Sequence, residues 1–170
     1  MKRLIILLSL GILTYQISSA QTGIAKAQAM FIYNFSRLIE WPENYKTGTF
    51  VIGVIGSPEL AAELTSYTTG KKVGLQDIVI KQYKDHFEID RCQILFISFA
   101  KSKSLSDAAA FLQNKSTLLI SEKTGSIEAG SAINFSIVGD KLKFEISPAN
   151  ANKYGIKMSS KLNEMAVKVY

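Results

Sequence analysis

The 170-residue sequence is poor in the side chains that most active sites need, since it holds one cysteine and one histidine. A single cysteine, Cys92, cannot form an intramolecular disulfide, and with His86 alone no His/Cys cluster for zinc is possible. A Ser-His-Asp arrangement would depend on His86, and no nucleophile elbow occurs. Neither a Walker loop nor a dinucleotide fingerprint is found. We therefore expect a protein that is not an enzyme and has no cofactor or metal, with Cys92 as an inert core thiol.

Dense basic runs with interleaved aromatic residues are also lacking, so we expect no nucleic-acid partner. The lysines are scattered along the chain, and the formal net charge is +6. Loss of the two positive charges at Lys2 and Arg3 would leave +4. Such a charge favours a mild attraction to an anionic membrane surface or an acidic partner.

The first twenty residues follow the pattern of a secretory signal peptide. Lys2 and Arg3 precede the apolar run Leu4–Thr14, and Ser18-Ser19-Ala20 supplies small residues before a cleavage site. The alternative is a buried N-terminal helix. The run is too short to span a bilayer, and no later segment is long and apolar enough. We predict export, cleavage near Ala20 and a single domain over residues 21–170, with no membrane span in the mature chain.

The segment Ile24–Pro42 predicts a deeply buried helix that ends at Trp41-Pro42, because a residue before proline disfavours helix. On a helical wheel one broad apolar arc contains Ala27, Met30, Phe31, Phe35, Leu38, Ile39 and Trp41. Asn34 projects from the middle of this arc. It is interpreted either as a buried amide that holds a neighbouring loop or as a ligand contact beside Tyr33.

Strand and helix patterns alternate through the middle of the chain. Apolar, β-branched runs predict strands at 49–55, 78–82, 92–98 and 117–120, with helices opened by caps at Ser57 and Ser104. Two alternating runs, 132–138 and 141–146, flank Gly139-Asp140 and predict a hairpin. An amphipathic helix through Leu162, Met165, Ala166 and Val169 is expected at the end. The prediction is an α/β fold: a three-layer mixed sheet with parallel core strands, a C-terminal antiparallel hairpin and helices on both faces.

The run from Lys26 to Pro42, with Phe31-Ile32-Tyr33-Asn34-Phe35 and Glu40-Trp41-Pro42, resembles the opening signature of YfiR-like proteins. The resemblance continues through the segments Cys92–Ser98, Ala132–Phe135 and Lys143–Ile146 and ends near Gly155-Ile156 and Ser159-Ser160. It covers nearly all of the mature chain in the same order.

This resemblance implies a non-enzymatic α/β regulator in the periplasm of Gram-negative bacteria. Well-studied members bind the periplasmic sensor domain of a membrane-bound diguanylate cyclase and inhibit the cyclase. A change in redox state or an outer-membrane lipoprotein releases this inhibition. Members often form dimers, so a homodimer is a possibility here. Because Cys92 has no partner, control through an internal disulfide is not expected. A sensor kinase is an alternative membrane partner.

Two functions stay open at this point: a regulator that docks on a membrane sensor, and a periplasmic small-ligand binding protein. An exposed apolar patch near the hairpin or the last helix would favour the regulator. A polar pocket near Gly56, Ser98 and Ser121, at the carboxyl edge of the sheet, would favour the ligand-binding protein. The candidate binding residues are Tyr33, Asn34, Glu40 and Trp41, which form either the family-specific surface or the support of the first helix.

Overall fold

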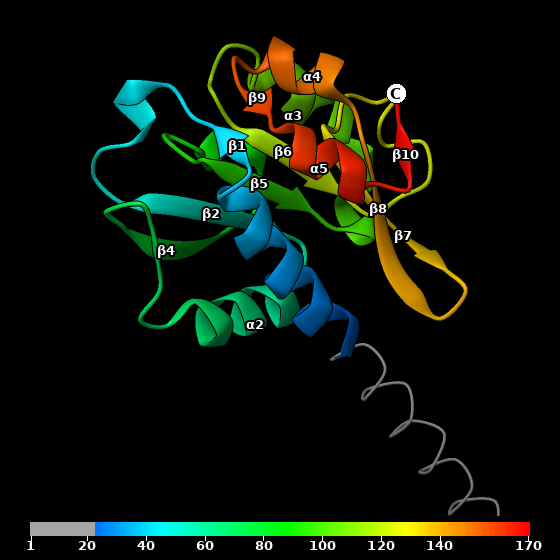
Figure 1. Ribbon diagram of the computed structural model, residues 1–170, viewed down its shortest axis with the longest axis horizontal. Helices are drawn as coiled ribbons and strands as arrows, with labels where there is room; N and C mark the ends of the chain where they lie inside the picture. Colours follow the sequence, from blue (N-terminus) through cyan, green and yellow to red (C-terminus); the bar gives the residue numbers. More distant parts are fainter. Residues whose placement is uncertain (1–22) are drawn as a thin grey trace, which may run out of the picture.

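The computed structural model describes residues 23–170, so the predicted signal peptide at residues 1–20 lies outside the described residues. An eight-stranded sheet forms the centre, in the order β10-β8-β7-β6-β5-β2-β4-β3 (Figure 1). Its strands are β2 (Phe50–Ile55), β3 (Lys72–Val73), β4 (Gln76–Tyr83), β5 (Ile94–Ile97), β6 (Leu118–Ser121), β7 (Ile133–Val138), β8 (Lys141–Ile146) and β10 (Lys168–Val169).

The sheet is parallel at its centre and has an antiparallel pair toward each edge, β7 with β8 on one side and β3 with β4 on the other. Strands β4, β2, β5, β6 and β7 run parallel, while β7 and β8 form an antiparallel hairpin around Gly139-Asp140. Every residue of β2, β5 and β6 is buried, as expected of parallel strands covered on both faces. The predicted mixed α/β fold is thereby confirmed, including the C-terminal hairpin.

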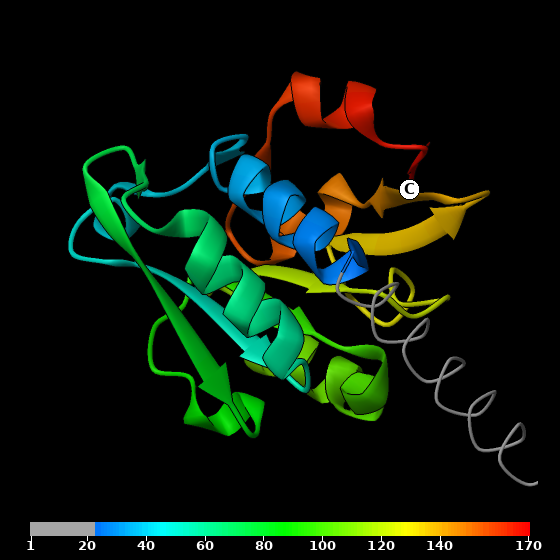
Figure 2. The same cartoon turned by 90° about the horizontal axis from the view of Figure 1, so that it is seen from below.

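Helices cover both faces of this sheet. The helix at residues 23–36 and α2 (Pro58–Thr68) lie over one face, and α3 (Leu105–Phe111) lies over the other (Figure 2). Helix α2 begins as predicted, because the Ser57 hydroxyl accepts a hydrogen bond from the Leu60 amide at 3.3 Å.

The start of α3 differs from the predicted capping box. The chain enters this helix through a 3-10 segment, η3 (Phe99–Ser104), and the Ser104 hydroxyl donates backward to the Lys101 carbonyl at 2.9 Å. Ser104 is the N-cap position of α3, as predicted, but its hydroxyl makes no capping hydrogen bond. The inward residues of this helix are as expected, since Leu105, Ala108, Ala109 and Leu112 are buried.

The first helix is shorter than predicted, because it ends at Ser36 and not at Trp41-Pro42. The Ser36 hydroxyl donates to the Tyr33 carbonyl at 2.6 Å, and the Trp41 indole N–H donates to the Ser36 carbonyl at 3.1 Å. Trp41 thus satisfies a carbonyl that the end of the helix leaves free. After the turn, β1 (Ile39–Glu40) pairs antiparallel with β9 (Lys157–Met158).

The earlier end also rotates the inferred buried face of this helix. Ala25, Ala29, Ile32 and Phe35 are buried, whereas Met30 is 43% exposed and Asn34 is exposed. Leu38, Ile39 and Trp41 are not helical, so the predicted apolar arc, which included these three residues, is not the buried face of the helix. The interpretation of Asn34 as a buried core amide is wrong.

Four phenylalanine rings join this helix to the hairpin. Phe35 stacks on Phe135 with ring centroids 5.9 Å apart and meets Phe144 edge-on at 4.8 Å. Phe31 contacts Phe144 at 5.5 Å. Such aromatic pairs add to the stabilisation from burial alone.

The C-terminal segment is more broken than the predicted helix. It contains α4 (Pro148–Lys153), β9, α5 (Ser160–Met165) and β10. The amides of Val167 and Tyr170 donate to carbonyls of β8 at 3.0 and 2.9 Å. The prediction of one helix reaching Val169 is wrong, because these backbone groups complete the edge of the sheet. Two further 3-10 segments, η1 (Glu43–Tyr45) and η2 (His86–Glu88), lie in the connections.

The orientation of the first helix can be tested by unfolding. Ile32→Ala should lower the free energy of unfolding by about 2–5 kcal/mol, because it leaves a cavity in the core. Met30→Ala, at an exposed position, should change it by about 0.5 kcal/mol or less. Urea unfolding followed by far-UV circular dichroism measures both. A larger loss for Met30→Ala than for Ile32→Ala would contradict the described orientation.

Candidate functional site

The four candidate residues lie around the end of the first helix but do not converge on one point. Tyr33 faces α2, with its ring 5.9 Å from the Tyr67 ring and 5.0 Å from the Lys71 ammonium. Asn34 lies on another side, toward α5. Glu40 is exposed on β1, and Trp41 is buried with its ring 5.4 Å from that of Phe50. Of the four, only Asn34 lines the groove described next.

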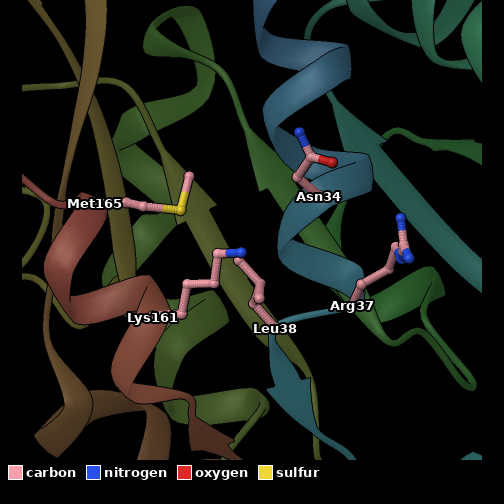
Figure 3. A pocket seen from close by; sticks show the side chains of 5 residues that line it. All are labelled: Asn34, Arg37, Leu38, Lys161 and Met165. Atoms are coloured by element: carbon pink, nitrogen blue, oxygen red, sulfur yellow. The ribbon is translucent and has the colours of Figure 1, made fainter.

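A groove of about 380 Å³ lies between the last turn of helix 23–36 and α5 (Figure 3). We call it the helix-end groove, and its lining residues are Asn34, Arg37, Leu38, Lys161 and Met165. Figure 3 shows Met165 and Lys161 on the α5 wall and Asn34 on the helix wall. The Lys161 side chain reaches toward Leu38, and Arg37 points away from α5.

Backbone hydrogen bonds hold the two walls of this groove together. Ile39 pairs with Met158 and Glu40 with Lys157, and the Ser159 amide donates to the Leu38 carbonyl at 3.0 Å. Ser159 then caps α5 through its hydroxyl, which accepts from the Leu162 amide at 3.3 Å. The positions of Leu38 and Lys161 relative to each other are therefore set by the main chain.

The helix-end groove carries positive charge without a matching acid. Within residues 23–170, neither Arg37 nor Lys161 has an ion-pair partner, and no carboxylate lines the groove. Leu38 and Met165 supply apolar surface in the same groove. Since Arg37 and Lys161 point in different directions, the groove suits two separate anionic groups on a larger partner better than one small anion.

The carboxyl edge of the sheet, where a small ligand was the alternative, is occupied by the protein's own contacts. The Ser98 hydroxyl donates to the Gly56 carbonyl at 3.0 Å, and the Ser121 hydroxyl donates to the Ile97 carbonyl at 3.1 Å. Gly56 has φ of +81°, and a Cβ at this position would lie 2.5 Å from Cγ of Lys101. These contacts use the hydroxyl hydrogens of Ser98 and Ser121, so a ligand at this edge could only donate to their oxygens.

Cys92 is buried beside β2 and has the properties of an inert thiol. Its Sγ donates to the Ile94 carbonyl at 2.7 Å. Burial is the main cause that raises the pKa of the Cys92 thiol to about 12.

His86 is also buried, and its ring lies 4.1 Å from that of Phe87 and 5.4 Å from that of Phe111. In the part of the chain from 23 to 170, no three His, Cys, Asp or Glu side chains are grouped to hold a metal ion.

The mixed sheet and its two helical layers define an α/β protein with an open cationic groove at the end of its first helix. The chain belongs to the YfiR/HmsC-like family, whose model matches residues 25–167. This family is regulatory rather than catalytic and acts in signalling through diguanylate cyclases. A comparison with curated proteins finds no match. Across residues 23–170, no helix has the length and apolar character needed to cross a bilayer.

Sequence reasoning missed Arg37, Leu38, Lys161 and Met165 as parts of one groove. Arg37 lies within the segment that the sequence predicts as one long helix, and Lys161 lies far along the chain. Their proximity depends on the β1–β9 pairing, and two-residue strands have no periodic signal in the sequence.

The state of Cys92 gives a prediction for pH dependence. The folded pKa of about 12 exceeds the ordinary value of 9.0, so the thiol contributes stability that is complete below pH 9 and is lost as pH rises toward 12. Between pH 9 and 10 the free energy of unfolding should fall by up to about 1.4 kcal/mol per pH unit from this group. In Cys92→Ala, the free energy of unfolding measured in urea should fall less steeply with pH between pH 9 and 10. Tyr154, whose pKa burial raises to about 12, keeps its contribution in both proteins. The pKa of Tyr83 is raised to about 12 mainly by burial and also by the Cys92 charge, so its contribution should decrease together with that of Cys92 in the variant.

Iodoacetamide supplies a second measurement of the same property. The folded protein should resist alkylation at pH 8 and react only in urea. Rapid alkylation of the folded chain would contradict the assignment of an inert thiol. So would a free energy of unfolding that falls with pH as steeply in Cys92→Ala as in the wild type.

Proposed function

We propose that residues 21–170 form an exported periplasmic protein that binds the periplasmic sensor domain of a membrane signalling protein and modulates its activity. A diguanylate cyclase is the first candidate partner, and a sensor kinase is the second. The signal-peptide pattern of residues 1–20 supports export. Membership of the YfiR/HmsC-like family supports the signalling role.

The observation that carries this proposal is the helix-end groove, where Arg37 and Lys161 are both exposed and unpaired within residues 23–170. Arginine recognises carboxylates through two parallel hydrogen bonds, and exposed charges accelerate the encounter with an oppositely charged partner. Met165 adds a flexible apolar contact of the kind that adapts to a partner surface. An acidic surface on the sensor domain, with apolar residues at its centre, fits this combination.

A second feature supports docking over small-ligand binding. Near the hairpin tip, Ile137 is 54% exposed and Val138 is 55% exposed, and in the last segment Val167 and Val169 are about half exposed. These are the regions where exposed apolar surface was expected of a regulator.

The four candidate residues take different parts in this proposal. Asn34 contacts the partner directly from the groove, while Trp41 supports the site by holding the Ser36 carbonyl where the helix ends. Tyr33 and Glu40 lie on neighbouring sides and extend the contact surface. A homodimer is compatible with this arrangement and stays a prediction.

Reversal of charge in the groove tests the proposal. Lys161→Glu and Arg37→Glu should each weaken binding of the purified sensor domain by about tenfold, because each places a repulsive charge in the interface. Isothermal titration calorimetry of the mature protein against the periplasmic domain of a co-transcribed membrane cyclase or kinase measures this. Affinity should also fall as salt is raised from 50 to 500 mM.

Lys103→Glu is the matched control, since Lys103 is exposed in η3 and lies outside the groove. It makes the same change in net charge and should leave affinity within about twofold of the wild type. Equal weakening by Lys103→Glu and Lys161→Glu would mean that net charge, and not the groove, governs binding.

A further inference from the structure

Leu75 occupies a position where its side chain contributes almost nothing to the fold. It is 94% exposed, the highest value among the large apolar side chains described. Strands β3 and β4 pair through Val73 and Gln76, so Gly74 and Leu75 form a two-residue hairpin loop. Gly74, with φ of +58°, satisfies the first position of such a turn. The second position normally holds a small polar residue, so a leucine here requires an explanation outside the fold.

A groove of about 510 Å³ lies directly beside Leu75. Its apolar wall consists of Ile39, Trp41 and Val73, and Leu75 stands at its margin. Arg37 and Lys46 lie at the same groove, and no acid lines it. We call this the Trp41 groove.

The two grooves adjoin at Arg37, which lines both. Lys46 pairs with Glu43 at 2.6 Å, but both side chains are more than half exposed. An exposed pair of this kind contributes little, so a stronger anionic partner can replace Glu43. The Trp41 groove therefore presents an apolar wall, a protruding leucine and two cations that can accept carboxylates.

We propose that Leu75 and the Trp41 groove bind an extended acidic segment of a partner polypeptide. Apolar side chains of that segment pack between Leu75 and Trp41, and its carboxylates lie against Arg37 and Lys46. A second copy of this chain fits less well, because a two-fold contact would bring Arg37 and Lys46 close to the same two cations. The inference rests on the proposed function for the kind of partner, and it adds the chemistry of the partner segment.

Trp41 supplies a direct signal for the test, because it is the only tryptophan in the chain. Its fluorescence in the mature protein is followed during titration with two probes, acetyl-Glu-Glu-Leu-Leu-Glu-Glu-amide and acetyl-Lys-Lys-Leu-Leu-Lys-Lys-amide. The acidic peptide should bind at least about fivefold more tightly than the basic peptide, and its affinity should fall with added salt.

Leu75→Ser should weaken binding of the acidic peptide by at least about fivefold, because it removes the apolar contact and leaves the charges in place. The loop accepts serine, so the variant should keep its far-UV circular dichroism and thermal midpoint. Phe99→Ser is the matched control: it removes a large exposed apolar side chain from η3, which lines neither groove, and should leave the titration unchanged.

In the peptide titration, three results would overturn this inference: no binding of the acidic peptide at millimolar concentration, equal binding of both peptides, or an unchanged affinity in Leu75→Ser.

A separate measurement, sedimentation velocity, tests for a second copy. A concentration-dependent dimer that Leu75→Ser abolishes would overturn the inference in favour of a second copy. If sensor-domain binding is weakened by Lys161→Glu but not by Leu75→Ser, the proposed function stands and this inference fails. If no sensor domain binds while the peptide titration behaves as expected, the inference stands and the proposed partner is wrong.

Discussion

The packing of Phe35 against Phe135 and Phe144 is the contact that holds the first helix, and with it the helix-end groove, in place. It fixes helix 23–36 to the hairpin of β7 and β8, although the two elements are distant in sequence. Burial of one such ring stabilises a core by several kcal/mol, since its truncation to alanine costs about 3–5 kcal/mol. The end of this helix provides Arg37 to both grooves, so neither groove keeps its shape unless these rings stay packed.

The cationic surface exists because the helix stops early. If the helix continued to Pro42, Arg37 and Trp41 would lie one turn apart on the same face, and β1 could not pair with β9. Instead the chain turns after Ser36, where the Trp41 indole donates to the Ser36 carbonyl. Leu38 then faces α5, while Ile39 and Trp41 face the loop that contains Leu75. The same short segment thus divides its apolar residues between two sides, with Arg37 between them.

Much of the fold follows from local sequence patterns, because buried strands and capped helices have short-range signals. The apolar run of β2, the cap at Ser57 and the hairpin at Gly139-Asp140 were all predictable in this way. The end of the first helix was not, because it depends on a tertiary hydrogen bond from Trp41 and on pairing with β9. The same dependence explains why Asn34 was misplaced. The groove itself was beyond prediction, since nothing local in the sequence connects Arg37 with Lys161.

The pairing of β1 with β9 has a consequence for how a partner would be held. Because main-chain bonds join the two walls, the surface exists before any partner arrives, and little conformational freedom is lost on association. Recognition can then rely on a few exposed charges and apolar side chains, each worth a modest free energy. Under the proposed function, such a complex would form quickly and separate readily, as reversible regulation of a partner requires.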